Sequence, residues 1–243
     1  MIDRAERSMP LIDDLLESIR LRDFPVKRLT IGSHWTVVES RYVGLAHAYK
    51  ARERRSIESS KELIGTSAFE IAQLIRSPNV HEAGMGAAAL NSLIEPSGRP
   101  GNVFIGIFEI IPGKTVTVVG RFPIYGEIAA VAGRSYLLEL EPREGELPAR
   151  AGEEVIPQSD IVVISATSLI NKTLPHLLEL CAKAHAKAFI IGPSTPMSDI
   201  LLRYGAYRLG GVRVTDIEAL IESALGGAKS SKELAGVELI VKP

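Results

Sequence analysis

The sequence predicts an α/β protein, with a Rossmann-like, mostly parallel sheet domain preceded by a smaller α+β domain. Strands and helices alternate along the second half of the chain, which is typical of a parallel sheet. The runs "DIVVIS" and "AFIIG" are short and continuously apolar, as expected of strands that helices cover on both faces. The stretch "PSGRPGN" interrupts this patterning with prolines and glycines. We therefore expect domains over residues 1–100 and 101–243.

The predicted first domain begins with an amphipathic helix in "MPLIDDLLESI", where Leu11, Leu15 and Ile19 recur at four-residue steps. The segments "RLTIGSHWTVVES" and "RYVGLAHAYK" follow as two strands of an antiparallel hairpin. The segments "SAFEIAQLI" and "NVHEAGMGAAALNSLI" are then predicted to be helical. The second carries Gly84 and Gly86, each of which costs a helix about 1 kcal/mol relative to alanine. We expect these small residues to permit close approach of another backbone or a ligand.

The predicted second domain contains five strands and four helices. The strands are Val116–Val119, Tyr136–Leu140, Ile161–Ser165, Ala188–Ile191 and Ala206–Gly210. The helices are Ile124–Ala132, Leu174–Ala184, Met197–Tyr204 and Ile217–Leu225. This order predicts "TVTVVG" as an interior strand of the sheet, with parallel neighbours.

Composition narrows the class of protein. The 243 residues are 46% hydrophobic and carry a formal net charge of −1, without the basic surplus of a dedicated nucleic-acid binder. The densest basic stretch, "KARERR", is interpreted as a solvated strand end or turn. The single cysteine, Cys181, lies on the apolar side of a predicted helix, which favours inert packing and a reducing compartment. We expect a cytoplasmic protein with neither nucleic-acid nor membrane partners; a homodimer is left open.

Three loops follow the carboxyl ends of predicted strands, where ligands of open α/β sheets bind. They are "GRFPIYG", "SATSLINKT" and "GPSTPMS". Each leads into a helix N-terminus, whose free amides favour an anion. The residues expected to bind a ligand there are Gly120, Arg121, Phe122, Pro123, Thr167, Ser168, Asn171, Gly192, Pro193, Ser194 and Thr195. For each hydroxyl by itself, helix capping is the competing interpretation.

The first loop resembles a dinucleotide-binding turn only at its start. Gly120 follows an apolar strand, but the second and third glycines of the fingerprint are replaced by Arg121, Phe122 and Pro123. Glu139 stands near the end of the second strand, where Rossmann proteins place the acid that binds a ribose diol. The loop therefore suits a small anionic or polar ligand better than a dinucleotide, with Arg121 as a source of positive charge.

Five motifs in order carry a resemblance to a known family: "RYVGLAHAY", "HEAGMGAAALNSLI", "VVGRFP", "DIVVISATSLINKTL" and "GPSTPMS". The chain resembles, over nearly its whole length, a two-domain family whose C-terminal module is labelled a putative heavy-metal chelation domain. The N-terminal module of that family resembles the N-terminal domain of enolase. The resemblance implies an active site where the two domains meet, and adds Glu82, Gly86 and Asn91 of the small-residue helix to the strand-end loops.

The resemblance raises the question of metal binding. The five histidines are His34, His47, His81, His176 and His185, and none forms an HxxxH pair or a Cys–His cluster. A tight site normally needs three or four ligands, so a site would have to assemble across the domains, and its ligands are unknown from sequence. The implied cofactor is a divalent heavy metal, or a metal chelate in which a small molecule already carries the metal.

Two classes of function remain open. One is a protein that binds a small anionic ligand or metal chelate in an interdomain cleft. The other is an enzyme acting on a small anionic or nucleotide-like substrate in the same cleft, with Glu82 as general base and Asn91 beside it. The sequence has neither a Cys–His pair nor a GxSxG elbow, which weighs against the enzyme.

Overall fold

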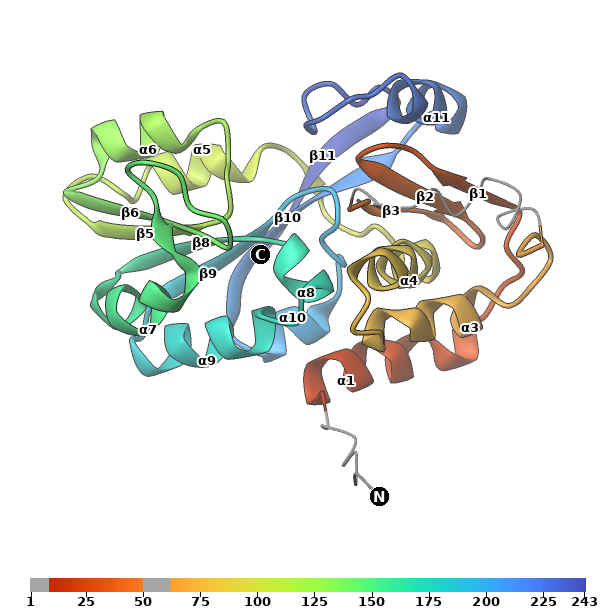
Figure 1. Cartoon of the computed structure of the whole chain (residues 1–243), viewed down its shortest axis with the longest axis horizontal. Helices are drawn as coiled ribbons and strands as arrows, with labels where there is room; N and C mark the ends of the chain where they lie inside the picture. The colour runs from red at the N-terminus through yellow and green to blue at the C-terminus, as the bar shows by residue number, and fades with distance from the viewer. Residues whose placement is uncertain (1–8, 50–61) are drawn as a thin grey trace.

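The computed structural model describes residues 9–49 and 62–243, and "KARERR" begins at Lys50, outside the described residues. Two sheets organise these residues: a three-stranded antiparallel sheet near the N-terminus and an eight-stranded, mostly parallel sheet after it. Figure 1 shows the large sheet with helices on both sides, and the small sheet beside it over a layer of helices. The predicted α/β fold class is confirmed.

The N-terminal domain is a small antiparallel sheet covered by helices. Its elements are α1 (Pro10–Ile19), β1 (Arg28–Ile31), β2 (Trp35–Glu39), β3 (Val43–His47), α3 (Ala68–Ala72) and α4 (Val80–Leu93). The apolar residues of α1 that predicted its amphipathic face are all buried. The prediction of one strand over "RLTIGSHWTVVES" is wrong: residues 32–34 form a turn between β1 and β2, which pair antiparallel. Gly32 there leaves room for the Ala224 carbonyl, which a Cβ atom would approach to 2.6 Å.

The small residues of α4 serve packing inside the N-terminal domain. A Cβ atom on Gly86 would lie 2.1 Å from the backbone nitrogen of Ile75, and one on Gly84 would lie 2.8 Å from the His47 carbonyl oxygen. Opposite them, a Cβ atom on Gly44 of β3 would lie 2.0 Å from the Ala88 carbonyl oxygen. The helix cost of these glycines is therefore offset by close contact of α4 with β3 and with the turn before it.

The C-terminal domain is built on the large sheet, in the order β4-β11-β10-β9-β8-β5-β6-β7. The strands are β4 (Arg99–Pro100), β5 (Thr115–Val119), β6 (Arg134–Glu139), β7 (Leu147–Pro148), β8 (Ile161–Ser165), β9 (Lys187–Ile191), β10 (Ala206–Val214) and β11 (Val237–Lys242). β5 pairs in parallel with both β6 and β8, which confirms the interior position predicted for "TVTVVG". β11 is antiparallel to β10 and was not predicted.

Helices cover both faces of this sheet (Figure 1). They are α5 (Val103–Phe108), α6 (Tyr125–Val131), α7 (Gly152–Val155), α8 (Thr167–Ile170), α9 (Leu174–Lys183), α10 (Asp199–Arg203) and α11 (Ile217–Leu225). Along β8, Ile161 and Val163 join the core under α5 and α6, whereas Val162 and Ile164 join the core under α9. This alternation explains why the strand is apolar at every position.

The two domains share buried apolar surface and polar contacts. One hydrophobic core runs from Leu11 of α1 to Ile240 of β11. The Tyr204 hydroxyl donates to Asp14 at 2.8 Å, and the Trp35 indole donates to the Ala228 carbonyl at 2.8 Å. The domains are therefore joined on both sides of the region between them. Among the described residues, we find no helix with the length and apolar character that a membrane span requires.

Candidate functional site between the domains

A cavity of about 850 Å³ lies between the domains, at the carboxyl ends of β5, β6, β8 and β9. The chain crosses from the β6 side of β5 to its β8 side here, so the cavity sits at the topological switch point of the sheet. The expected ligand-binding residues that line it are Gly120, Arg121, Phe122, Pro123, Glu139, Thr167, Ser168, Asn171, Gly192, Pro193 and Ser194. Only Thr195 of that set does not. The sequence therefore predicted where the cavity lies. The role of each residue follows from the contacts that it makes.

Gly120 makes the sharp turn at the end of β5. Its φ is +96°, in the left-handed region that side chains rarely adopt. A Cβ atom there would lie 2.8 Å from the Cβ atom of Ser165 at the end of β8. Glycine thus allows the β5 and β8 loops to meet at the floor of the cavity.

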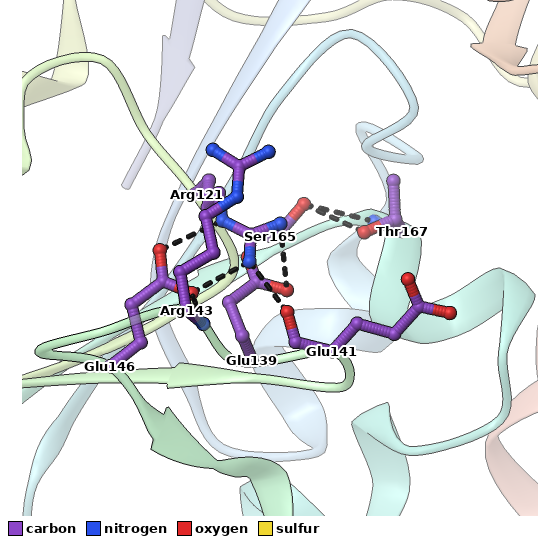
Figure 2. Close-up of polar contacts among 7 residues, drawn as sticks. All are labelled: Arg121, Glu139, Glu141, Arg143, Glu146, Ser165 and Thr167. Atoms are coloured by element: carbon purple, nitrogen blue, oxygen red, sulfur yellow. Dashed lines mark hydrogen bonds and ion pairs between the residues drawn. The ribbon is translucent and has the colours of Figure 1, made fainter.

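Arg121 is held by acidic groups of the protein (Figure 2). Its Nε and Nη2 atoms lie 2.8 and 2.6 Å from the two carboxylate oxygens of Glu146, and Nη2 also donates to the Glu141 carbonyl at 2.6 Å. Its Nη1 atom lies 3.8 Å from Glu139. The hydrogen bond from Arg121 is the main reason that the pKa of Glu146 falls to about 2. These contacts do not support the expectation that Arg121 offers its charge to an anion.

Three aromatic side chains of the N-terminal domain form one wall of the cavity: Trp35, His47 and Tyr49. The His47 ring meets Trp35 edge-on at 5.8 Å between centroids, and meets Tyr49 edge-on at 5.0 Å. Burial lowers the pKa of His47, and the neighbouring His34 lowers it further, so the imidazole is neutral at pH 7. Trp35 and Tyr49 were not among the predicted site residues. The only sequence signal for Tyr49 was the position of "HAY" at the end of a strand, and Trp35 had none.

Tyr49 connects this wall to the loop after β8. Burial raises the pKa of Tyr49, while its hydrogen bond with Thr167 opposes that shift and the nearby Glu139 carboxylate adds to it. Thr167 in turn exchanges a hydrogen bond of 2.8 Å with Ser165. Tyr49 of the N-terminal domain and Thr167 of the C-terminal domain are therefore in contact at the switch point.

Asn91, Arg208 and Ser168 each have a buried side-chain atom without a hydrogen-bond partner among the described residues, and of these three only Ser168 lines the cavity. Its side chain is 3% exposed and lines the cavity, yet its Oγ atom has no hydrogen-bond partner among the described residues. Leaving a buried hydroxyl unpaired costs about 1–3 kcal/mol. Asn171, by contrast, accepts hydrogen bonds from the amide and hydroxyl of Thr173, so its side-chain oxygen serves the capping alternative.

The loop after β9 is a structural joint. The Thr195 hydroxyl donates to the carbonyls of Gly192 and Gly210, and Thr195 does not line the cavity. The Ser194 hydroxyl accepts a hydrogen bond of 2.9 Å from the His47 amide. The Asn91 side chain donates to the Ser194 carbonyl at 3.1 Å and to the Leu45 carbonyl at 3.0 Å. Asn91 therefore reaches the cavity loop from behind and fixes it to the N-terminal domain.

Glu82 lies away from the cavity. Its carboxylate accepts a hydrogen bond from the Ser77 hydroxyl, just before α4, and it is not among the lining residues.

The helix N-termini behind the loops supply less positive potential than expected, because α6, α8 and α10 have only 7, 4 and 5 residues. Positive potential at the cavity must then come mainly from side chains.

The charged residues of the lining give a surplus of two positive charges. The cations are Arg121, Arg150, Lys229 and Lys232, and the acids are Glu139 and Glu153. Arg150, Lys229 and Lys232 are exposed, and their side chains make no ion pair with any described residue. Because the whole chain has a net charge of −1, this surplus is local to the cavity and favours an anionic ligand.

The described residues contain no group of three or more His, Cys, Asp or Glu side chains that could hold a metal ion. His176 pairs with Glu153, and His34 is hydrogen-bonded to Ser33. Cys181 is buried, and burial raises its pKa to about 12, so its thiol is protonated and inert. This donor set does not fit a bare metal ion bound by the protein alone.

Two family models match the chain, one over each half. The DUF364 model, described as "Putative heavy-metal chelation", matches residues 102–240. A second model with the same description, DUF4213, matches residues 12–94. A comparison with curated proteins gave no match.

Two solved structures share the whole fold. A DUF364 protein of unknown function from Desulfitobacterium hafniense DCB-2 is 28% identical, with a TM-score of 0.83 and coverage of 96% of this chain and 97% of that chain. A second, from Pyrococcus horikoshii, is 20% identical, with a TM-score of 0.73 and coverage of 96% and 98%. The fold of both domains is thus shared with these two structures.

Proposed function

Because this chain belongs to the DUF364 family, described as putative heavy-metal chelation, we propose that it binds a small anionic organic molecule in the cavity between its domains. A metal ion handled by the protein arrives as a chelate of that molecule. The ligand supplies the coordinating groups, since the described residues offer no cluster of three metal-binding side chains. With the metal held by the small molecule, the family description agrees with the finding that the described residues contain no metal-binding cluster.

The observation that carries the proposal is the unpaired Ser168 hydroxyl. It lies in the wall of a cavity large enough for a small organic molecule. The oxygen itself is covered in this structure, so the side chain must rotate about χ1 to meet a ligand atom, and the hydrogen bond then removes the cost of the unpaired group. The exposed cations Arg150, Lys229 and Lys232 add long-range attraction for a negative charge.

The test is native mass spectrometry of the purified protein, with elemental analysis of the same sample. We expect a retained small molecule, and any heavy metal to leave together with it on denaturation. Ser168→Ala should lower the retained fraction without lowering the free energy of unfolding, because no protein partner is lost and the cost of an unpaired buried hydroxyl is removed. Ser18→Ala, on α1 away from the cavity, is the matched control.

A charge variant provides the second arm. Arg150→Gln, Lys229→Gln and Lys232→Gln together should lower ligand occupancy, and the loss should shrink as salt is added. Arg20→Gln, Arg22→Gln and Lys183→Gln make the same change in net charge away from the cavity and should leave occupancy unchanged. A metal that remains on protein stripped of small molecules would overturn the proposal.

The enzyme alternative is favoured by one observation, the neutral imidazole of His47 beside the cavity. Its base would be His47 and not Glu82, which lies elsewhere. Incubation of the protein with its retained molecule separates the two functions. A binding protein returns that molecule with unchanged mass, whereas an enzyme returns a product, and its conversion should be lost in His47→Phe.

A further inference from the structure

A second groove, of about 280 Å³, lies on the large sheet and shares no lining residue with the cavity between the domains. Its lining residues are Arg99, Pro100, Arg208, Val241 and Pro243. Arg99 is paired with Val241, and Arg208 with Phe189. Val241 and Phe189 both belong to the core under α5 and α6, and paired residues of neighbouring strands point to the same face of a sheet. Both arginines therefore lie on the α5 side of the sheet, near its β4 edge.

Neither of these two arginines has a counter-ion. Arg99 is exposed and Arg208 is half-buried, and neither side chain forms an ion pair or a hydrogen bond with any described residue, Pro243 included. The Nε atom of Arg208 is buried without a partner, whereas its two Nη atoms are not buried and can meet a ligand. A guanidinium that is partly withdrawn from water without an acceptor costs free energy. An anion in the groove would lower that cost.

The sequence of α5 makes room for the Arg208 guanidinium. A Cβ atom on Gly106 would lie 3.0 Å from the Arg208 Nη1 atom, closer than most Cβ atoms approach a neighbour. That nitrogen is the only atom given within 4 Å of such a Cβ atom among the described residues. Glycine weakens a helix relative to alanine. Gly106 therefore leaves space for a charged side chain, whereas Gly84 and Gly86 of α4 leave space for backbone.

The surroundings of the groove add positive charge. The Tyr207 ring, beside the groove, has the Arg208 guanidinium carbon 5.4 Å from its centroid and the Lys187 ammonium 4.8 Å from it. Lys187 also forms no ion pair with any described residue. Asp160, whose carbonyl accepts from the Lys187 amide, has its carboxylate 3.7 Å from the Lys114 ammonium instead. Positive charge is thus concentrated here in a chain whose net charge is −1.

We propose that this groove is a second binding site, for the phosphate group of a small phosphate monoester. The inference does not depend on what the cavity between the domains binds. A guanidinium presents parallel N–H donors that match phosphate oxygens. Two unpaired guanidinium groups also balance the charge of a phosphate monoester, which is about −1.5 to −2 at pH 7. The other lining residues are apolar, so they suit a short organic body beside the phosphate.

Isothermal titration calorimetry of the full chain with ethyl phosphate, near neutral pH, tests the site. We expect binding in the parent and a loss of affinity of at least about tenfold in Arg99→Gln with Arg208→Gln. Lys229→Gln with Lys232→Gln makes the same change in net charge at the cavity. This control should keep the affinity for ethyl phosphate within about twofold of the parent, because salt screens distant charges.

Two single variants keep the test open if Arg208→Gln alters the fold. Arg99→Gln changes an exposed side chain and should weaken ethyl phosphate by about fivefold or more. Gly106→Ala should displace the guanidinium and weaken ethyl phosphate without lowering the free energy of unfolding, because alanine is the better helix former. Gly126→Ala, in α6 with open space around an added Cβ atom, is its control and should bind like the parent.

Diethyl phosphate identifies the kind of phosphate that the groove prefers. A diester carries one negative charge, as each phosphate of a nucleic-acid backbone does, so it should bind at least about tenfold more weakly than ethyl phosphate. Equal affinity for the two esters would overturn a monoester site. The site itself is refuted if ethyl phosphate does not bind, or if its binding is lost in the lysine pair and kept in the arginine pair.

Discussion

The loops that follow β5 and β9 look alike in sequence but do different work. Both begin with a glycine and contain proline and polar residues, "GRFP" and "GPSTP". The first is exposed and is held by ion pairs between Arg121 and the acids of the β6–β7 region. In the second, Ser194 and Thr195 are 3% and 4% exposed and bond to backbone groups.

The difference lies in what each loop faces. The β5 loop borders the open cavity, so its backbone shape matters more than its polar side chains. The β9 loop also borders the cavity, but it packs against the N-terminal domain, and the hydroxyl groups of Ser194 and Thr195 both have protein partners there. Polar residues at the carboxyl edge of the sheet are therefore held by ion pairs with side chains in one loop and by hydrogen bonds with the backbone in the next.

The largest effect is expected from Gly120→Ala in the β5 loop. The positive φ and the contact with Ser165 should together cost about 3 kcal/mol of unfolding free energy, measured by urea denaturation. Gly126→Ala is the control, because Gly126 lies in α6 with nothing within 4 Å of an added Cβ atom. Equal stability of the two variants would show that the β5 turn is not strained.

Thr195→Val should be next, in the β9 loop. It removes the one hydroxyl hydrogen that the Gly192 and Gly210 carbonyls share in a buried turn while keeping the shape of the side chain, so stability should fall by about 1–2 kcal/mol. Because Thr195 does not line the cavity, the fraction of retained ligand at a temperature where the variant is folded should match the parent. Loss of ligand without loss of stability would show that Thr195 contributes to ligand binding.

The sequence was most informative where one local signal decided the structure. Continuous apolar runs located β5, β8 and β9, and glycine-bearing loops after them located the cavity. It failed where a partner distant in sequence decides. β11 alternates weakly and owes its place to pairing with β10, and the turn at Gly32 follows from contact with α11.

The same limit applies to the site. Tyr49 acquires its role only because the N-terminal domain folds over Thr167 and Glu139. Thr195 was expected to bind ligand because hydroxyl groups at strand ends suit both capping and binding, and only its contacts separate the two. Glu82 shares the small-residue helix with Asn91, but only Asn91 faces the cavity loop.

A pH effect is expected at the contact between the β9 loop and β3. The folded protein lowers the pKa of His47 from 6.5, so the unfolded chain binds more protons on acidification. Stability contributed by the neutral form is therefore present above pH 6.5 and lost as pH falls below it. Chemical denaturation between pH 7.5 and 5 should show this slope, and His47→Phe should flatten it; an unchanged slope assigns it to another group.

The smallest effect is expected from Glu146→Gln at the β5 loop. The folded-state pKa of Glu146 is depressed from 4.5 to about 2, so its stabilising contribution is present above pH 4.5 and lost as pH falls toward 2. The variant should be less stable than the parent at pH 7 by no more than about 1 kcal/mol, since partly exposed pairs contribute little, and the difference should shrink as pH falls through that window. An acid profile identical to that of the parent would contradict the ion pair.

The most direct test of the central claim is a crystal structure of the protein purified without chelators, with anomalous data collected at the absorption edges of heavy metals. We expect electron density for an organic molecule between the domains, with an atom within hydrogen-bond distance of the Ser168 hydroxyl. Any metal signal should lie within that molecule. A metal ion coordinated by three or more protein side chains, or an organic ligand bound only outside the cavity, would contradict the account.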